Sequence, residues 1–238
     1  MSGIIIRDLA GMEEFFAAEA LQRTVWGEGD KEDPADLMMV IQHEGGLVAG
    51  AFAGGDLMGY VFGFPTREPH AQHSHRLAVH PRARGEGLAL RLKRYQREWC
   101  MARGITLVRW TFDPLRHTNA HLNIARLGAE VFTYFKDYYG EMKGINAGLP
   151  SDRLLAEWRL GSERATALAR DGALPMPAAR NVRRVAIPPD LDRLLKEDYS
   201  AALAHRQRVR DELMRAFAEG HAITGYDAAE FAYVLTPR

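Results

Sequence analysis

Residues 76–92 constrain the fold more than any other part of the chain. Their sequence, RLAVHPRARGEGLALRL, begins with an apolar run and passes through Pro81, Gly85 and Gly87 before a pattern of alternating apolar and basic positions. This order predicts a β-strand, a tight turn and an amphipathic helix that begins directly after the turn. Such a turn points backbone N–H groups at one place, where the positive end of the helix dipole adds to them. The stretch therefore predicts a site for an anionic group.

Two familiar phosphate-binding motifs do not fit this turn. A dinucleotide fingerprint requires a third glycine at position 90, which is Leu90, and a P-loop requires Gly-Lys-Ser/Thr, which the sequence lacks. The remaining alternative to an anion site is an ordinary strand-turn-helix junction whose glycines allow tight packing.

Composition narrows the function further. The chain has 238 residues with 31 basic and 31 acidic side chains, and this balance argues against a nucleic-acid partner. Its single cysteine, Cys100, excludes an internal disulfide and a cysteine-rich zinc site, and we expect Cys100 to fill the core and no metal to be required. The sequence has neither a secretion signal nor a long apolar span, which predicts a cytoplasmic protein without a membrane partner.

Periodicity predicts a mixed sheet flanked by helices in the first two thirds of the chain. The helix at about 86–103 is expected to pack on the sheet through Leu88, Leu92, Tyr95 and Trp99, with Lys93 off this stripe. A shorter helix should run from about Thr118 to a C-cap at Gly128. The expected strands are 4–7, 47–52, 57–64, 73–79, 105–112, 131–135 and 154–160, and the other expected helices are 12–25 and 37–42.

The composition changes after residue 161. We predict a main domain at 1–161, a helix and linker at 162–180, and a partial β-α-β module at 181–238. In this module a strand at 182–187 precedes a helix at 191–219, and 222–235 forms one broken strand or two. Arg206 lies on the apolar stripe of that helix and should therefore have an anionic partner, either a buried carboxylate or a ligand.

The pattern Arg82-x-x-Gly85-x-Gly87, after a strand that ends Leu77-Ala78-Val79, resembles the acyl-CoA pyrophosphate loop of the GCN5-related N-acetyltransferase (GNAT) superfamily. The order of elements over residues 4–160 is similar to the topology of that superfamily, and the whole chain resembles a bacterial subgroup with a C-terminal extension. The resemblance implies an α/β (α+β) fold with a mixed central sheet, flanking helices and a small C-terminal β-α-β extension.

The resemblance also implies which residues bind the acyl-CoA. The end of the strand would pair with pantetheine, and N–H groups from about Ala83 to Leu88 would hold the pyrophosphate. Asn119 and Asn123, four apart on one helix face, would contact pantetheine or a water, unless Asn119 or Thr118 caps the helix. Arg82 and Arg84 either add charge or are solvated surface residues. The expected cofactor-binding residues are Leu77, Ala78, Val79, Arg82, Ala83, Arg84, Gly85, Glu86, Gly87, Leu88, Asn119 and Asn123.

The catalytic residues match the family pattern less well than the acyl-CoA loop does. Many family members carry a tyrosine four residues before the glycine that ends the short helix, and here that position is Ile124. Tyr139 is our first choice for the missing acid, with aromatic packing as the alternative. His73 and His75 are candidate bases, because imidazole suits amine deprotonation, although strand histidines are often hydrogen-bonded packing residues.

Three arginines could bind a substrate carboxylate through a bidentate fork, or could be structural: Arg76, Arg116 and Arg153.

The resemblance implies an acyl-CoA-dependent N-acyltransferase. The donor would be acetyl-CoA or another short acyl-CoA, and the acceptor would be the primary amine of a small molecule, with an amino acid as one such substrate. The alternative is a GNAT module that binds or senses acyl-CoA with little or no catalysis. In that case the second module could regulate the first or form the surface of a homodimer.

Overall fold

The computed structural model describes residues 3–27, 29–140, 149–172 and 181–238, and these divide into two compact units. Unit 1 contains the described residues up to Arg109, and unit 2 begins at Trp110 and continues to the C-terminus. The division lies inside strand β5 (Leu107–Phe112). This division is based on which residues pack together. The predicted domain boundaries at residues 161 and 180 therefore stay a prediction. The predicted linker falls mostly on residues 173–180, outside the described residues.

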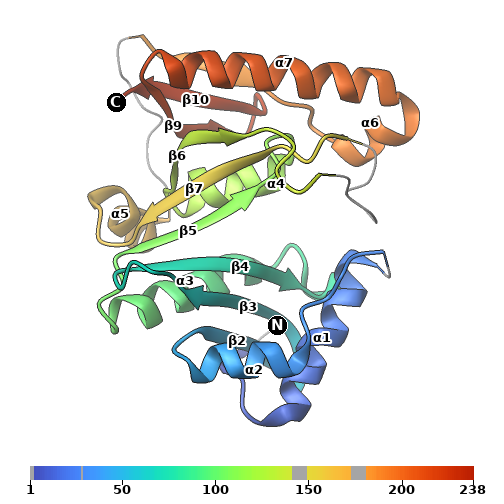
Figure 1. The fold of residues 1–238 in the computed structure, drawn as a ribbon, viewed down its shortest axis with the longest axis vertical. Coiled ribbons are helices and arrows are strands. Elements are labelled where there is room, and N and C mark those ends of the chain that lie inside the picture. Colours follow the sequence, from blue (N-terminus) through green and yellow to red (C-terminus); the bar gives the residue numbers. More distant parts are fainter. Residues whose placement is uncertain (1–2, 28, 141–148, 173–180) are drawn as a thin grey trace. The chain divides into compact units, whose positions relative to one another are not determined.

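Unit 1 contains a mixed sheet in the order β1-β2-β3-β4-β5 (Figure 1). The first four strands pair antiparallel, and β5 joins β4 in parallel. The strands are β1 (Ile5–Asp8), β2 (Leu47–Ala53), β3 (Asp56–Pro65), β4 (Ala71–Val79) and the start of β5. The helices are α1 (Gly11–Trp26), α2 (Ala35–His43), the 3₁₀ turn η1 (Pro81–Ala83) and α3 (Leu88–Met101).

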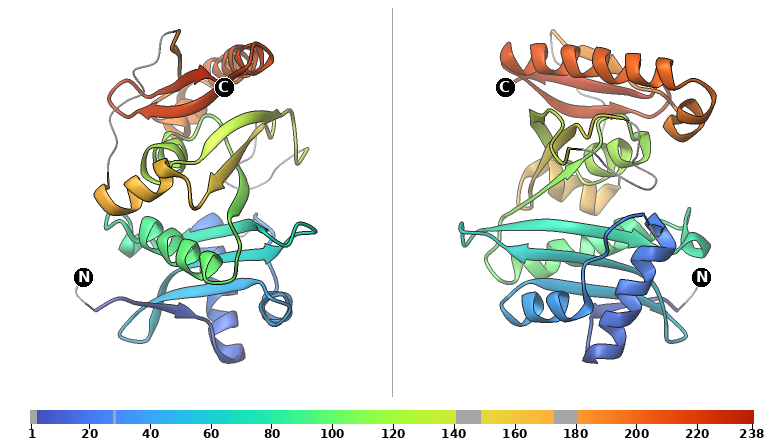
Figure 2. Two further views of the ribbon diagram at one scale, coloured as in Figure 1. Left: turned by 90° about the vertical axis from the view of Figure 1, so that its left-hand side faces the viewer. Right: turned by 45° about the vertical axis from the view of Figure 1, so that its right-hand side comes forward.

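Helices cover both faces of this sheet (Figure 2). On one face, α1 and α2 form an apolar core with β2, β3 and β4, and this core consists of Leu9, Phe15, Ala18, Leu21, Ala35, Met38, Val48, Phe52, Tyr60, Phe62 and Ala78. On the other face, α3 packs through Leu88, Leu92 and Trp99, as its apolar periodicity predicts, whereas Tyr95 of the predicted stripe is only half-buried.

Lys93 contradicts the prediction that it lies off the buried stripe of α3. Its residue is 2% exposed, and its Nζ donates hydrogen bonds to Ser74 Oγ at 3.1 Å and Gln96 Oε1 at 2.6 Å. The Gln96 amide in turn donates to Gln72 Oε1 at 2.7 Å. Periodicity missed this polar network because two of its three acceptors, Ser74 and Gln72, lie on β4. Cys100, one turn after Gln96 on α3, is buried, as expected.

Replacing Lys93 with methionine should remove a rise in stability with pH. Burial lowers the pKa of Lys93 to about 7, whereas a lysine in an unfolded chain titrates near its ordinary value. The unfolded chain therefore binds more protons above pH 7, and the free energy of unfolding rises with pH there. This single group should contribute roughly 1.5 kcal/mol between pH 7 and pH 8.5.

Urea unfolding of the unaltered chain and of Lys93→Met at pH 7 and pH 8.5 measures this contribution. Lys31→Met, at an exposed lysine of the same unit, is the control and should leave the pH dependence unchanged. A Lys93→Met variant with the same pH dependence as the unaltered chain would contradict the prediction.

Unit 2 contains an antiparallel sheet in the order β7-β6-β9-β10-β8. Its strands, after the end of β5, are β6 (Glu130–Phe135), β7 (Arg153–Arg159), β8 (Arg183–Ala186), β9 (His221–Asp227) and β10 (Ala232–Pro237). The helices are α4 (His117–Ala120), the π-helical turn η2 (His121–Arg126), α5 (Glu163–Asp171), α6 (Leu191–Glu197) and α7 (Tyr199–Ala218). The mixed sheet of unit 1 and the helices that flank the sheets confirm the predicted fold class.

Two details of unit 2 differ from the predicted elements. The single helix expected at 191–219 is two helices, because Asp198 leaves helical geometry and its side chain accepts the Ala201 N–H at 2.9 Å as the cap of α7. The region expected to hold one or two strands holds two, β9 and β10, and Val131 of β6 pairs with Ile223 of β9. The C-terminal extension thus continues the sheet of its own unit.

Arg206 has the anionic partner that its apolar surroundings require. Its residue is 1% exposed, and its guanidinium donates to Asp113 Oδ2 at 2.7 Å. A carboxylate just after β5 therefore balances a buried charge on α7. This confirms the structural alternative for Arg206.

Candidate functional site

The glycine turn of unit 1 has the backbone geometry expected of an anion-binding loop. Strand β4 ends at Val79, the η1 turn follows, and Gly85 and Gly87 have φ values of +83° and +73° immediately before α3. A Cβ placed on either glycine would meet no heavy atom within 4 Å. The positive φ, and not tight packing, explains why glycine occupies both positions. The alternative that these glycines only allow close packing is therefore excluded.

The turn's own hydrogen bonds narrow the set of N–H groups that can face an anion. The N–H groups of Arg82, Ala83 and Arg84 donate to His80 Nδ1 at 3.2 Å, His80 O at 2.8 Å and Pro81 O at 3.3 Å. These three bonds hold the turn in place. The Ala83 N–H thus serves the turn and the Ala83 side chain is buried, and a cofactor-binding role for Ala83 stays a prediction.

The remaining donors lie at the glycines and at the start of α3. The first hydrogen bond of the helix runs from the Arg91 N–H to Gly87 O at 3.1 Å. The N–H groups of Leu88 and its neighbours in the first turn therefore have no acceptor within the helix. In the described part of the chain, the Gly85 and Gly87 N–H groups have no acceptor either. Arg82 and Arg84 are exposed beside them and can add positive charge.

The end of β4 has one free edge within unit 1. Strand β4 pairs with β3 from Gln72 to Val79, but its pairing with β5 covers only Ala71, Gln72 and His73. Among the strands of unit 1, the second edge of Leu77, Ala78 and Val79 therefore has no partner. This is the condition that the predicted pairing with pantetheine requires, and the pairing itself stays a prediction.

A β-bulge sets the direction of the side chains on β4. Phe62 of β3 pairs with Arg76 and the next residue, Gly63, pairs with Ser74, so His75 is an extra residue on β4. Gln72 and Ser74 bond to Gln96 of α3 on one face. His75 and Arg76, although adjacent in sequence, both contact the loop between α1 and α2 on the other face.

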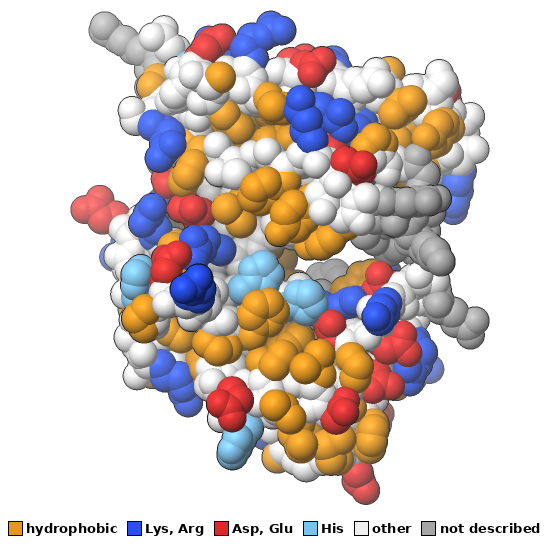
Figure 3. Space-filling view, in the orientation of Figure 1, with side chains coloured by type: hydrophobic (Ala, Val, Ile, Leu, Met, Phe, Trp, Pro, Cys, Tyr) orange, Lys and Arg blue, Asp and Glu red, His pale blue; other side chains and the backbone are white. Residues whose placement is uncertain are grey.

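The partner of His75 is Asp33, which no local pattern in the sequence predicts. The His75 Nε2 lies 3.2 Å from Asp33 Oδ1, and the Arg76 Nε lies 2.8 Å from Asp33 Oδ2. The only signal in the sequence is the acidic stretch Asp30-Lys31-Glu32-Asp33, which does not reveal its partner. Figure 3 shows surface histidine side chains next to acidic and basic ones.

His73 is less suited to act as a base. Its ring stacks on Phe64 with centroids 4.9 Å apart. Burial lowers its pKa to about 4, with the charges of His75, Arg109 and Lys93 acting in the same direction. A base this weak would take a proton from an amine poorly at neutral pH. His75 is partly exposed and lies 3.2 Å from a carboxylate, so it is the better candidate.

The three arginines predicted to bind substrate have partners within their own units. Arg76 donates to Asp30 Oδ2 and Lys31 O, both at 2.6 Å, and its guanidinium lies 4.7 Å from the Trp26 ring centroid. Arg116 contacts Asp192 at 2.7 Å, and Arg153 donates to Asp152 O at 2.8 Å. These contacts favour the structural alternative for each, and substrate binding by them stays a prediction.

Unit 2 holds the remaining predicted site residues. Asn119 is exposed on α4 and Asn123 is buried on η2, so the two differ in accessibility although they are four residues apart. The helix begins at His117, which excludes a capping role for Asn119 or Thr118. Ile124, where the family tyrosine would lie, is fully buried.

Tyr139, the predicted acid, is half exposed in unit 2. Its hydroxyl lies 3.1 Å from Thr111 Oγ1, and its ring centroid lies 5.1 Å from the Arg153 guanidinium. The acid role of Tyr139 stays a prediction.

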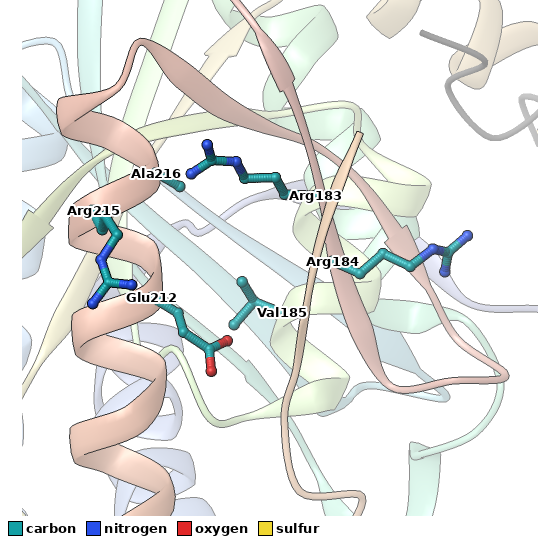
Figure 4. A pocket seen from close by; sticks show the side chains of 6 residues that line it. All are labelled: Arg183, Arg184, Val185, Glu212, Arg215 and Ala216. Atoms are coloured by element: carbon teal, nitrogen blue, oxygen red, sulfur yellow. The ribbon is translucent and has the colours of Figure 1, made fainter. Parts of the chain in front are cut away.

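Unit 2 also has an open pocket of about 320 Å³ between β8 and α7 (Figure 4). Arg183, Arg184, Glu212 and Arg215 line it. Figure 4 shows Arg184 pointing away from α7, and its guanidinium contacts Asp227 at 2.8 Å, while Arg183 contacts Glu219. These ion pairs offset much of the positive charge, and we assign no ligand to this pocket.

Comparison with known proteins identifies the family. Residues 12–128 match the model of the acetyltransferase (GNAT) family. This part of the chain belongs to the GNAT acetyltransferase family. It is accordingly an enzyme of the N-acetyltransferase class, whose members use acetyl-CoA as the acyl donor. No curated protein matches the chain in sequence.

Solved structures share the GNAT fold with this chain at low identity. The ribosomal-protein-S18-alanine N-acetyltransferase from Escherichia coli has a TM-score of 0.55 and 14% identity, with 67% of this chain and 96% of that chain covered. An N-acetyltransferase from Staphylococcus aureus Mu50 has a TM-score of 0.54 and 15% identity, with 67% and 99% covered. An aminoglycoside 6'-N-acetyltransferase complexed with coenzyme A has a TM-score of 0.52 and 15% identity, with 73% and 99% covered.

None of the helices in the described ranges has both the length and the apolar character needed to cross a membrane.

Proposed function

We propose that this GNAT enzyme binds acyl-CoA at the turn from Arg82 to Leu88 and transfers a short acyl group to the primary amine of a small molecule. The observation that carries the proposal is the pair of positive-φ glycines, Gly85 and Gly87, at the N-terminus of α3. Their open surroundings and the first-turn N–H groups suit a diphosphate, and the exposed Arg82 and Arg84 add charge beside it. Acetyl-CoA is the expected donor.

The reaction needs few protein groups because the thioester is already activated. The amine nitrogen attacks the thioester carbonyl and loses a proton, and the C–S bond breaks to release the free thiol of CoA. The protein must align the two substrates, accept the amine proton and stabilise the oxyanion. His75 is the residue of unit 1 best placed to accept that proton.

The contacts of the arginines bear on the class of acceptor. Each of the three predicted carboxylate-binding arginines already has a partner in its own unit. This lowers the support for an amino-acid acceptor relative to amines that have no carboxylate. Both classes therefore belong in the test.

A thiol-release assay tests the proposal. Purified protein is mixed with acetyl-CoA, propionyl-CoA or succinyl-CoA and with amino acids, polyamines, aminoglycosides or a peptide with a free N-terminal alanine, and released CoA thiol is measured. We expect release above the acceptor-free rate with at least one small-molecule amine. Release with the peptide alone would contradict the proposed acceptor class.

The absence of a tyrosine at Ile124 favours one second candidate, an acyl-CoA sensor. Calorimetric binding of CoA without thiol release for any pair of substrates would select that candidate over the transferase.

A further inference from the structure

We propose that Asp33 positions His75 as the base that accepts the proton of the acceptor amine. The inference deepens the proposed function and rests on it. Asp33 is a positioning residue here, because it acts on the reaction through the His75 ring.

The fold builds this contact from two separate features. The bulge at His75 breaks the strict alternation of β4, so His75 and Arg76 reach the same face of the sheet. The loop between α1 and α2 brings Asp33 to that face, 42 residues earlier in the chain than His75. Arg76 holds the loop through Asp30, Lys31 O and Asp33, so the carboxylate is fixed in position.

The surroundings of His75 keep Asp33 ionised. Burial alone would raise the pKa of Asp33, but the hydrogen bond to His75 and the charges of His75 and Arg76 outweigh it and lower that pKa. The other charged or titratable groups near the pair are Asp30 on the same loop, His73 with its ring centroid 6.1 Å from that of His75, and Tyr60 on β3. The Phe62 ring meets the His75 ring edge-on at 5.6 Å.

This arrangement fixes which ring nitrogen can act. When Nε2 carries the proton and donates it to Asp33 Oδ1, the lone pair of His75 is on Nδ1. The side chain of His75 is about one third exposed, so a substrate or a water can reach it. The proton lost by the amine moves to Nδ1 as the new N–C bond forms and the C–S bond breaks. The Asp33 carboxylate then stabilises the imidazolium.

The experiment compares Asp33→Asn with Asp30→Asn. Both variants remove one carboxylate that contacts Arg76, but only Asp33 also contacts His75. With acetyl-CoA and the best amine of the panel, we expect kcat/KM to fall about tenfold in Asp33→Asn and less than twofold in Asp30→Asn. His75→Ala should lose about 100-fold, and Asp33→Asn combined with His75→Ala should lose no more than His75→Ala.

The pH profile separates a positioning role from a structural one. The negative charge of Asp33 favours the protonated ring, so in Asp33→Asn the acidic limb of kcat/KM should move to lower pH by about one unit. CoA binding and the circular dichroism spectrum should stay unchanged in Asp33→Asn. In Asp30→Asn the acidic limb should not move comparably.

The two proposals fail in different ways. No thiol release by the unaltered chain would overturn the proposed function, and this inference with it. Turnover by the unaltered chain together with an unshifted pH profile in Asp33→Asn would overturn the role of Asp33 alone.

Discussion

Replacing Gly87 with valine is expected to weaken CoA binding at least about 30-fold, which corresponds to about 2 kcal/mol of binding free energy. At φ +73° a β-branched side chain costs about 1–3 kcal/mol of strain, so the turn would relax to another conformation. The N–H groups at the start of α3 would then no longer point at one place. The new side chain would also project into the open space in front of the helix. Isothermal titration calorimetry with CoA measures the change.

Gly104→Val is a closely matched control. Gly104 lies just beyond the other end of α3, has the same φ of +73°, and likewise has open space around the position of a Cβ. The two variants should therefore lose similar folding stability, but only Gly87→Val should lose affinity for CoA. Equal dissociation constants in the two variants would contradict the assignment of the turn as the diphosphate site.

Replacing Asp113 with asparagine is expected to lower the free energy of unfolding by about 3 kcal/mol, because it leaves the Arg206 charge buried without a carboxylate. Asparagine is nearly the same size and keeps an oxygen for the Leu115 N–H, which Asp113 Oδ1 accepts at 2.8 Å. The loss would therefore report the missing charge. Arg153, at 3.8 Å from Asp113 Oδ2, would lose part of its compensation as well. Urea unfolding measures the change.

Asp192→Asn tests whether burial causes this effect. The Arg116–Asp192 and Arg206–Asp113 pairs are both 2.7 Å long, but the carboxylate side chains are 59% and 14% exposed. An exposed pair contributes only about 0–1 kcal/mol, so Asp192→Asn should lose little stability. Combining Asp113→Asn with Arg206→Met should restore part of the lost stability, since the buried Arg206 charge is then removed together with its partner. Equal losses in Asp113→Asn and Asp192→Asn would show that burial is not the cause.

Local patterns in the sequence predict most of the elements of this fold. Strand β4, the glycine turn and α3 follow from an apolar run, Pro81 and two glycines, all within one short segment, because turn chemistry and helix periodicity are local properties. Lys93 shows where periodicity fails. It lies beside the apolar stripe of α3, and its burial depends on Ser74 and Gln96, of which Ser74 lies on a strand about twenty residues earlier.

In the candidate site too, the sequence predicts individual residues but not their distant partners. The sequence predicts His75 but not Asp33, because an acidic loop between two helices gives no sign of which strand it will contact. It likewise predicts that Arg206 needs an anion, but Asp113 lies 93 residues away and nothing local connects the two.

The sequence by itself thus determined the strand, the glycine turn and the helix that follows it, since a glycine turn before a helix requires no distant partner. The structure sharpened that turn by showing which N–H groups its own hydrogen bonds use. Only the tertiary structure decided the partners of the buried and half-buried charges, Asp33 with His75, Asp113 with Arg206 and the network around Lys93. Each of these depends on long-range packing, where burial removes water and makes the choice of partner energetically important.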